Sequence, residues 1–462
     1  MTASVAAGLS GDSGWILTAA TLVVAGLLLA PGWIVGRSAR LAALPSLAVA
    51  PALSSAIIAA AEILAHTLAL PWLPWGWAVI AGLTAVVALM ARLLVGAPPE
   101  HARRAASQGR AEWVILAAGL TVAVAVPAGV ILTVLPGPGY PAQVFDATFH
   151  LNAVAAIREG GNASMLGGLS ALYSGRAVYY PTVWHGLVAL APGGPAPVST
   201  AGVLALTAVV WPLSLLGLLA RAAGLDAVRA SETDRARRRQ RTCAVAAVLA
   251  LSAAVVGFPL LLMTALAVWP YALSVVGLPG VLVLYDLLRQ ETVSWRLRLV
   301  LVLLAMAAAG GVVAAHGTGL FNLAVLSPPF LVNLLVSRWR RSATRRGGRA
   351  LLVAGAVASV LVLAVGAWVM RASLASVLGY QRPAGGVGGI VATLGQALID
   401  LPMYGAVPGA SLPVGIVFGG LTLAAAWSAR AHRDQRPWLV MWLLSLLLVV
   451  LVGGPQWAGR QL

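Results

Sequence analysis

The chain has 462 residues, of which 60% are hydrophobic and only 9% are charged. Runs of about twenty apolar residues recur along it, each long enough to cross a bilayer as a helix. A soluble domain could not bury so much apolar surface, and the runs lack the two-residue alternation of β-barrel strands. The net charge of +17 does not indicate nucleic-acid binding, because the arginines lie in short segments between the apolar runs.

These runs predict an all-α, polytopic membrane protein with about twelve transmembrane helices. In chain order the predicted spans are 15–36, 43–66, 77–96, 113–135, 198–220, 242–268, 271–288, 299–315, 317–336, 350–370, 411–428 and 438–453. Two connections are long, at about 136–197 and 371–410, and the others are short.

The arginines predict the orientation of these spans. The sequence contains thirty arginines and no lysine. If the N-terminus is outside, all but five of these arginines lie on the cytoplasmic side. The five exceptions are Arg158, Arg176, Arg371, Arg382 and Arg460. Because cytoplasmic loops carry the excess of positive charge, we expect a multi-pass protein of the cell membrane with both long loops outside.

The first long outer loop contains the stretch FDATFHLNAVAAIREGG, residues 145–161. It predicts a helix that begins near Asp146 and ends at the glycine pair, with Asp146 and His150 on one face. The helix is too short and too polar to span, so we expect it at the outer interface. A second interfacial helix is predicted at HGLVAL, beginning at His185 and following Arg176 and Tyr180.

Other ionisable residues are predicted on the same side of the membrane. Glu62 and His66 lie near the outer end of the second span, His316 lies at an outer turn, and Asp400 lies in the second long loop. Polar groups gathered at one membrane depth indicate a site. Each also has a structural alternative: a helix or loop cap for the aspartates, hydrogen bonding for the histidines, headgroup contact for the arginines, a solvated helix end for Glu159, and a buried pair for Glu62 with His66.

Several catalytic motifs are missing from the sequence. It contains no Walker A loop, no HExxH and no CxxC, so ATP hydrolysis by this chain is not expected. The single cysteine, Cys243, cannot form an intramolecular disulfide.

This plan resembles the GT-C glycosyltransferases, multi-span enzymes with a large outer loop that carries an acidic residue and interfacial helices. The matching segments are FDATFHLNAVAAIREG, YYPTVWHG and AHGTGLFNLAVLSPP, and the Ala-, Gly- and Arg-rich composition is typical of an actinobacterial branch. Residues 113–462 would then form a GT-C-like membrane core, and residues 1–112 an N-terminal three-helix addition. Many GT-C enzymes have two adjacent acids in this loop, whereas here Asp146 is followed by alanine.

The resemblance implies transfer of a sugar from a polyprenyl-phosphate donor to an envelope glycan or lipid acceptor on the outer face of the membrane. Asp146 would deprotonate the acceptor or hold a divalent cation, with Glu159 as second choice. The substrate-binding residues would be His150, Arg158, Arg176, Tyr180, His185, His316 and Arg382. Membrane lipids are expected partners, and nucleic acid is not.

Two other functions stay open at this point. A transporter, or a flippase for lipid or polysaccharide, would use Glu62, His66 and Asp286 as proton-carrying groups and would contain broken helices. A membrane scaffold without chemistry would leave the outer polar residues scattered and distant from one another.

Overall fold

The structure is a computed structural model, which describes residues 11–96, 109–135, 137–140, 142–225, 232–290, 294–342, 368, 371, 411–431 and 435–448. Every regular element in these ranges is a helix, and one isolated β-bridge joins Leu166 to Tyr179. The predicted all-α fold is confirmed for this part of the chain. The chain forms two compact units, residues 1–323 and 324–462.

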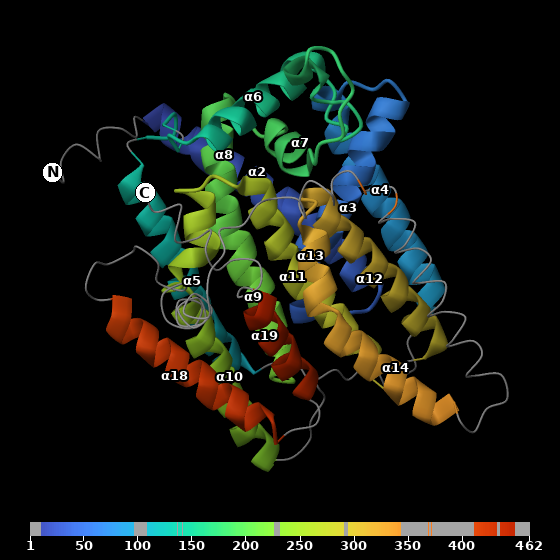
Figure 1. The fold of residues 1–462 in the computed structure, drawn as a ribbon, viewed down its shortest axis with the longest axis vertical. Coiled ribbons are helices and arrows are strands. Elements are labelled where there is room, and N and C mark those ends of the chain that lie inside the picture. Colours follow the sequence, from blue (N-terminus) through green and yellow to red (C-terminus); the bar gives the residue numbers. More distant parts are fainter. Residues whose placement is uncertain are drawn as a thin grey trace. The chain divides into compact units, whose positions relative to one another are not determined.

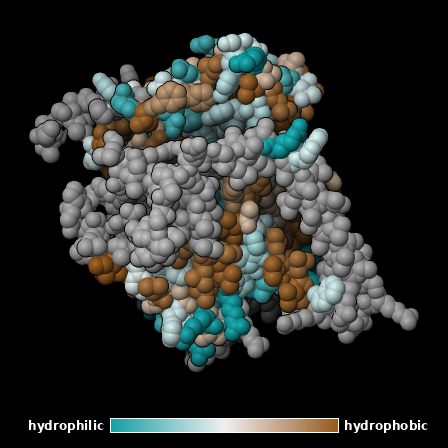
Figure 2. All heavy atoms as spheres, viewed as in Figure 1, coloured by the Kyte–Doolittle hydropathy of each residue, from teal (hydrophilic) through white to brown (hydrophobic). Residues whose placement is uncertain are grey.

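Seven helices of the first unit are long and apolar enough to cross a membrane. They are α2 (Gly11–Ser38), α3 (Ala43–Thr67), α4 (Trp72–Val95), α5 (Arg110–Val134), the continuous run of α8 (Pro195–Leu204), η3 (Ala205–Val210) and α9 (Trp211–Ala222), then α11 (Trp269–Leu288) and α12 (Trp295–Ala315). Large apolar side chains such as Leu22, Leu93 and Met306 are exposed on them. Figure 2 shows hydrophobic side chains in several patches of the face in view, and apolar side chains of this kind are what a membrane protein presents to lipid.

Helices long and apolar enough to cross a membrane are thus confirmed at the predicted spans 15–36, 43–66, 77–96, 113–135, 198–220, 271–288 and 299–315. The predicted span 242–268 is wrong as one helix, because α10 (Glu232–Ser252) begins in the Arg-rich segment and ends at Ser252. The chain then turns into the short π-helix η4 (Val256–Leu261), which contains Pro259. Val255, just before η4, has an extended backbone with φ of −81° and ψ of 98°, so the apolar run does not continue as one straight helix.

The predicted span 317–336 is also divided. It consists of α13 (Gly319–Leu326) and α14 (Pro328–Ser342), which bend at a break and would count as an eighth span if taken together. The predicted span 411–428 is the helix α18 (Ser411–Ala429), and 438–453 is described only as α19 (Arg436–Leu448). Nearly all of 350–370 lies outside the described residues, so the total of about twelve spans stays a prediction.

Helix α3 is the centre of the first unit. It is rich in alanine and serine, and it packs against α2, α4, α9, α11 and α12. Four neighbouring glycines sit so close to its backbone that a Cβ atom would overlap it: Gly32, Gly217, Gly280 and Gly311. Small residues of this kind let membrane helices approach closely, which strengthens their van der Waals packing.

The packing of α3 can be compared with the domain boundary expected at 112/113. Since α3 contacts α9, α11 and α12, the first helices belong to the same compact unit as the segment after residue 112. The division at 323/324 does not coincide with the expected boundary at 112/113. That residues 1–112 are an addition to a GT-C-like core is a statement about the evolutionary origin of the chain, and it stays a prediction.

One end of the first unit is covered by two short helices, α6 (Phe145–Gly160) and α7 (Val183–Ala189). Figure 1 shows them lying across the ends of the long helices, and α7 contacts α3, α11 and α12. The two predicted interfacial helices are therefore present as helices, and α7 begins two residues earlier than expected.

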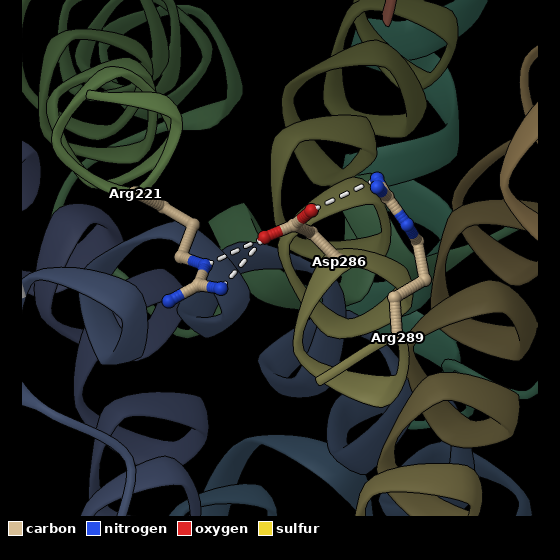
Figure 3. Close-up of polar contacts among 3 residues, drawn as sticks. All are labelled: Arg221, Asp286 and Arg289. Carbon is tan, nitrogen blue, oxygen red and sulfur yellow. Dashed lines mark hydrogen bonds and ion pairs between the residues drawn. The ribbon is translucent and has the colours of Figure 1, made fainter. Parts of the chain in front are cut away.

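An ion-pair cluster joins α9 to α11 at the opposite end of these helices (Figure 3). Asp286 accepts from Arg221 at 2.7–2.8 Å through one carboxylate oxygen and from Arg289 at 3.1 Å through the other. All three side chains are largely buried. Partly buried, multiply bonded ion pairs hold geometry more firmly than exposed pairs, so this cluster fixes the ends of α9 and α11.

Candidate functional site

The site is built around α6, whose sequence has clear beginning and end signals. Asp146 lies in its first turn, where a carboxylate interacts favourably with the helix dipole. Gly161 ends it in the left-handed conformation, with φ of 66°, which glycine adopts without strain. Along one face α6 buries Ala147, His150, Ala153, Val154 and Ile157. The spacing of these residues directs His150 inward, toward α7.

Two histidines meet between α6 and α7. Nδ1 of His150 lies 2.9 Å from Nε2 of His185, and the two side chains are 5% and 0% exposed. One ring donates its N–H and the other accepts, so at least one of the two rings must be neutral. Burial lowers the pKa of His150 to about 4, and the charge of His316 adds to this shift. Burial and the charge of His150 hold the pKa of His185 well below its usual value, against an opposing backbone interaction with Pro181.

Aromatic rings enclose this histidine pair. The ring of Trp269, at the start of α11, is centred 5.3 Å from that of His150, and Tyr180 is centred 5.7 Å from that of His185. Phe149 lies 5.0 Å from Tyr180, and Trp184 lies 6.0 Å from Trp269. Burial raises the pKa of Tyr180, with smaller contributions from Tyr173 and Asp146, so its hydroxyl keeps its proton at neutral pH. The pair therefore lies buried among aromatic rings.

His316 ends α12 on the same side of the unit. Its Nδ1 lies 2.7 Å from Oγ1 of Thr318, and its ring packs edge-on against Tyr271 at 5.7 Å. Burial lowers the pKa of His316, and its charge is close enough to shift the pKa of His150. The structure thus brings four predicted residues together: His150, Tyr180, His185 and His316.

An apolar cavity of about 360 Å³ is linked to the histidine pair through Trp269, although neither histidine lines it. Its walls come from the end of α5, the loop before α6, α8, and the segment from η4 to the start of α11, and they include Ile131, Val203 and Leu260. Trp269 lines the cavity and also packs against His150. The hydroxyl of Ser199, another lining residue, is buried without a hydrogen-bond partner among the described residues. A largely apolar space therefore ends at a small group of polar atoms.

The predicted acids and arginines lie elsewhere around the site. Asp146 is exposed, two residues after Val144 of the cavity wall, while Glu159 and Arg176 are exposed farther away along the chain. Arg158 donates to the carbonyl oxygens of Ala189, Ala191 and Gly193, at 3.1 Å for Ala189 and 2.6 Å for Ala191. These carbonyls lie at the end of α7 and just after it, so Arg158 caps that helix instead of facing the site. Arg382 and Asp400 lie outside the described residues.

Sequence reasoning missed two residues that shape this region. Trp269 was not singled out, although its position just before a proline at the start of a span is a signal for an aromatic residue at an interface. Thr182 was also missed. Its hydroxyl donates to Oε2 of Glu62 at 3.0 Å, which links α3 to the start of α7. The expected partner of Glu62, His66, is exposed one helical turn away.

The residues near the site do not suit a divalent cation. Such an ion takes about six oxygen ligands, several of them from carboxylates or substrate phosphates. Within the described ranges no group of three or more His, Cys, Asp or Glu side chains could hold a metal ion. Asp146 is a single exposed carboxylate, so no catalytic step is assigned to a bound metal here.

Comparison with known protein families places the chain in one of them. Residues 25–462 match the family model described as a family of unknown function, DUF6541. No curated protein and no solved structure matches the chain. Because the match covers nearly the whole sequence, the chain belongs to the DUF6541 family.

Proposed function

We propose that this protein is a membrane glycosyltransferase of the GT-C type. It would move a sugar from a polyprenyl-phosphate donor to a cell-envelope acceptor at the extracytoplasmic face of the cell membrane. The proposal is supported by an apolar cavity and a buried polar group that share one wall, beneath two short helices at one end of a membrane bundle.

The observation that carries the proposal is that Trp269 both lines the cavity and packs against His150. A polyprenyl phosphate has a long apolar chain joined to an anionic head, so its site needs apolar space that ends at polar groups. The cavity of about 360 Å³ falls in the usual size range of ligand pockets, roughly 300–1,000 Å³, and holds part of such a chain. The head would then lie near the start of α6.

The proposed roles follow from exposure and protonation. Asp146 is exposed and lies two residues after Val144 of the cavity wall, so it would accept the proton of the acceptor hydroxyl. His150 and Tyr180 are neutral at pH 7 and would donate hydrogen bonds to the donor head. Arg176 is exposed and would reach the phosphate, for which its planar guanidinium is suited. Arg158 takes no part, because its guanidinium is held by carbonyl oxygens.

The test is release of polyprenyl phosphate by purified full-length protein mixed with polyprenyl-phosphate sugars and envelope acceptor. We expect release by the wild type, and a loss of about a hundredfold or more in Asp146→Asn, the usual scale for a general base. Glu159→Gln is the matched comparison, because it removes the other acid of α6. If release were lost in Glu159→Gln and kept in Asp146→Asn, the general base would be Glu159 and not Asp146. No release from any donor would refute the proposal.

A transporter or flippase is the second candidate, because broken helices favour it. The chain breaks between α10 and α11 and again between α13 and α14, and such breaks often form substrate sites in transporters. Against it, Asp286 is bound through both carboxylate oxygens and lies at a helix end. Transport of a labelled lipid-linked sugar across proteoliposomes, abolished by Glu62→Gln, would favour this candidate.

A further inference from the structure

The first turns of α10 form a strongly basic segment, which the predicted orientation places on the cytoplasmic side. Residues 235–241 contain five arginines, of which four are exposed: Arg235, Arg237, Arg239 and Arg241. Arg238 is the exception, because it pairs with Glu112 of α5 at 3.2 Å and donates to the carbonyl of Leu225. The four exposed arginines make no ion pair with another described residue, so their charge is open to a ligand.

The packing of α10 on α5 fixes the depth of this segment in the membrane. Glu112 lies beside Arg238, and farther along both helices Gly119 lies against the backbone of Ala246, so the two helices run in the same direction. Helix α5 is long and apolar enough to cross a membrane, and its apolar run begins at the exposed Trp113. The arginines of α10 therefore lie where α5 enters the membrane, at the depth of the lipid headgroups.

One face of α10 joins two of these arginines to an apolar surface. Arg237 and Arg241 lie one helical turn apart, so their guanidinium groups reach the same side of the helix. At helical spacing this face continues with three exposed apolar residues: Ala244, Val248 and Leu251. Arg237 has no hydrogen bond to a described residue, and Arg241 has one, at 3.3 Å to the carbonyl of Ala223. Two cations with free N–H groups thus lie at the end of an exposed apolar strip.

The other two exposed arginines are not followed by such a strip. Arg235 and Arg239 are also one turn apart, but the residues at the matching positions after them are buried: Thr242, Ala246 and Leu249. The two pairs carry the same charge on the same turns of one helix. Only the pair of Arg237 and Arg241 is continuous with a surface that acyl chains can cover.

Two cations at the end of an apolar strip match one ligand class. The planar guanidinium group suits phosphate, and basic residues beside a membrane span attract anionic lipids. We propose that Arg237 and Arg241 bind the phosphate of an anionic phospholipid whose acyl chains lie along the strip of Ala244, Val248 and Leu251. A zwitterionic lipid carries a balancing ammonium group and binds less tightly, and a free phosphate ester has no chains to cover the strip. The site does not depend on the transferase proposal.

The experiment uses full-length protein in a nonionic detergent. Native mass spectrometry would measure retention of phosphatidylglycerol and of phosphatidylethanolamine with the same acyl chains. Glycerol phosphate, added as a competitor, tests whether the head alone occupies the site. The test variant combines Arg237→Gln with Arg241→Gln. The matched control combines Arg235→Gln with Arg239→Gln, which removes the same charge from the same helix.

We expect the wild type to retain phosphatidylglycerol in preference to phosphatidylethanolamine, and glycerol phosphate at equal concentration not to displace it. The test variant should bind phosphatidylglycerol about tenfold more weakly or worse, and the control should change binding by less than about threefold. Thermal unfolding checks that both are folded, and if the test variant is not, Arg237→Gln decides, with Arg239→Gln as its control.

Equal weakening in the test variant and the control would overturn the inference, because it would show a general attraction between a basic helix and anionic lipid. A wild type without preference for phosphatidylglycerol would also overturn it. Displacement of the lipid by glycerol phosphate would do the same, since the ligand would then be a soluble phosphate ester.

Discussion

His150 and His185 are 35 positions apart in the sequence, yet their ring nitrogens lie 2.9 Å apart. The pair is held by burial between α6 and α7 and by the rings of Tyr180 and Trp269. Its neutral state is a consequence of that burial, since no carboxylate pairs with either ring among the described hydrogen bonds and ion pairs. Protonation of the pair should therefore oppose folding.

The stability of the protein should fall as the pH falls below about 6.5. The folded pKa of His150 is about 4, below its ordinary value of 6.5, so between these values the unfolded chain binds the extra proton. The loss should reach about 3 kcal/mol by pH 4, and His185 adds to it in the same direction. The measurement is the thermal unfolding midpoint against pH, for wild type and His150→Gln. Parallel pH profiles for the two proteins would contradict the assignment.

Substitution of Arg158 should lower the stability of the protein, whereas substitution of Arg176 should lower its activity. Arg158→Ala removes the donors to the carbonyls after α7, and the free energy of unfolding should fall by about 1–3 kcal/mol. Arg176→Ala removes an exposed side chain, so stability should stay within about 0.5 kcal/mol while release of polyprenyl phosphate falls. Unfolding in denaturant, followed on both variants, checks the first part. Equal stability of the two variants would rule out the capping role of Arg158.

At the scale of elements, close contact with α3 organises the first unit. Four helices approach α3 through glycine, and each contact has no room for a side chain.

Most of these helices could be predicted from the sequence. The long ones were predicted from their apolar runs, and α6 from Asp146 near its start and the glycine pair at its end. The break after Ser252 was not predicted, because the hydrophobicity of residues 242–268 continues past it. The proline of this run, Pro259, is no clear signal either, since α3 continues through Pro51. The partners of Arg158 could not be predicted either, since a carbonyl oxygen leaves no trace in the sequence.

Neighbouring glycines of α12 provide a matched test of this packing. Gly311 lies against the backbone of Ala52 in α3, whereas a Cβ atom on Gly310 would meet no atom within 4 Å. Gly311→Val should therefore destabilise the protein by about 1–3 kcal/mol or more, the cost of overpacking, and Gly310→Val should have little effect. Thermal unfolding of both variants measures the difference. A Gly310 variant as unstable as the Gly311 variant would show that helix propensity, and not contact with α3, is responsible.

At the scale of the whole molecule, the orientation in the membrane rests on the distribution of arginine. The single cysteine, Cys243, is exposed just after Arg241, so the predicted topology places it near the cytoplasmic surface. In a Cys243→Ser background, a cysteine at Glu159 should react with an impermeant maleimide in intact cells. A cysteine at the exposed Arg239 should react only after the cells are opened. Labelling of the Arg239 position in intact cells would reverse the topology and place α6 and α7 inside.

The central claim is that a polyprenyl-phosphate donor occupies the apolar cavity beside the histidine pair. The most direct measurement is crosslinking of a polyprenyl phosphate with a photoreactive group in its chain, followed by peptide mapping. The account predicts crosslinks at the cavity wall, at Ile131, Val203 or Leu260, and competition by unlabelled donor. The apolar groove between α2 and α4, lined by Leu22, Ile34 and Trp77, is an internal comparison. Crosslinks confined to that groove, or unaffected by competitor, would contradict the account.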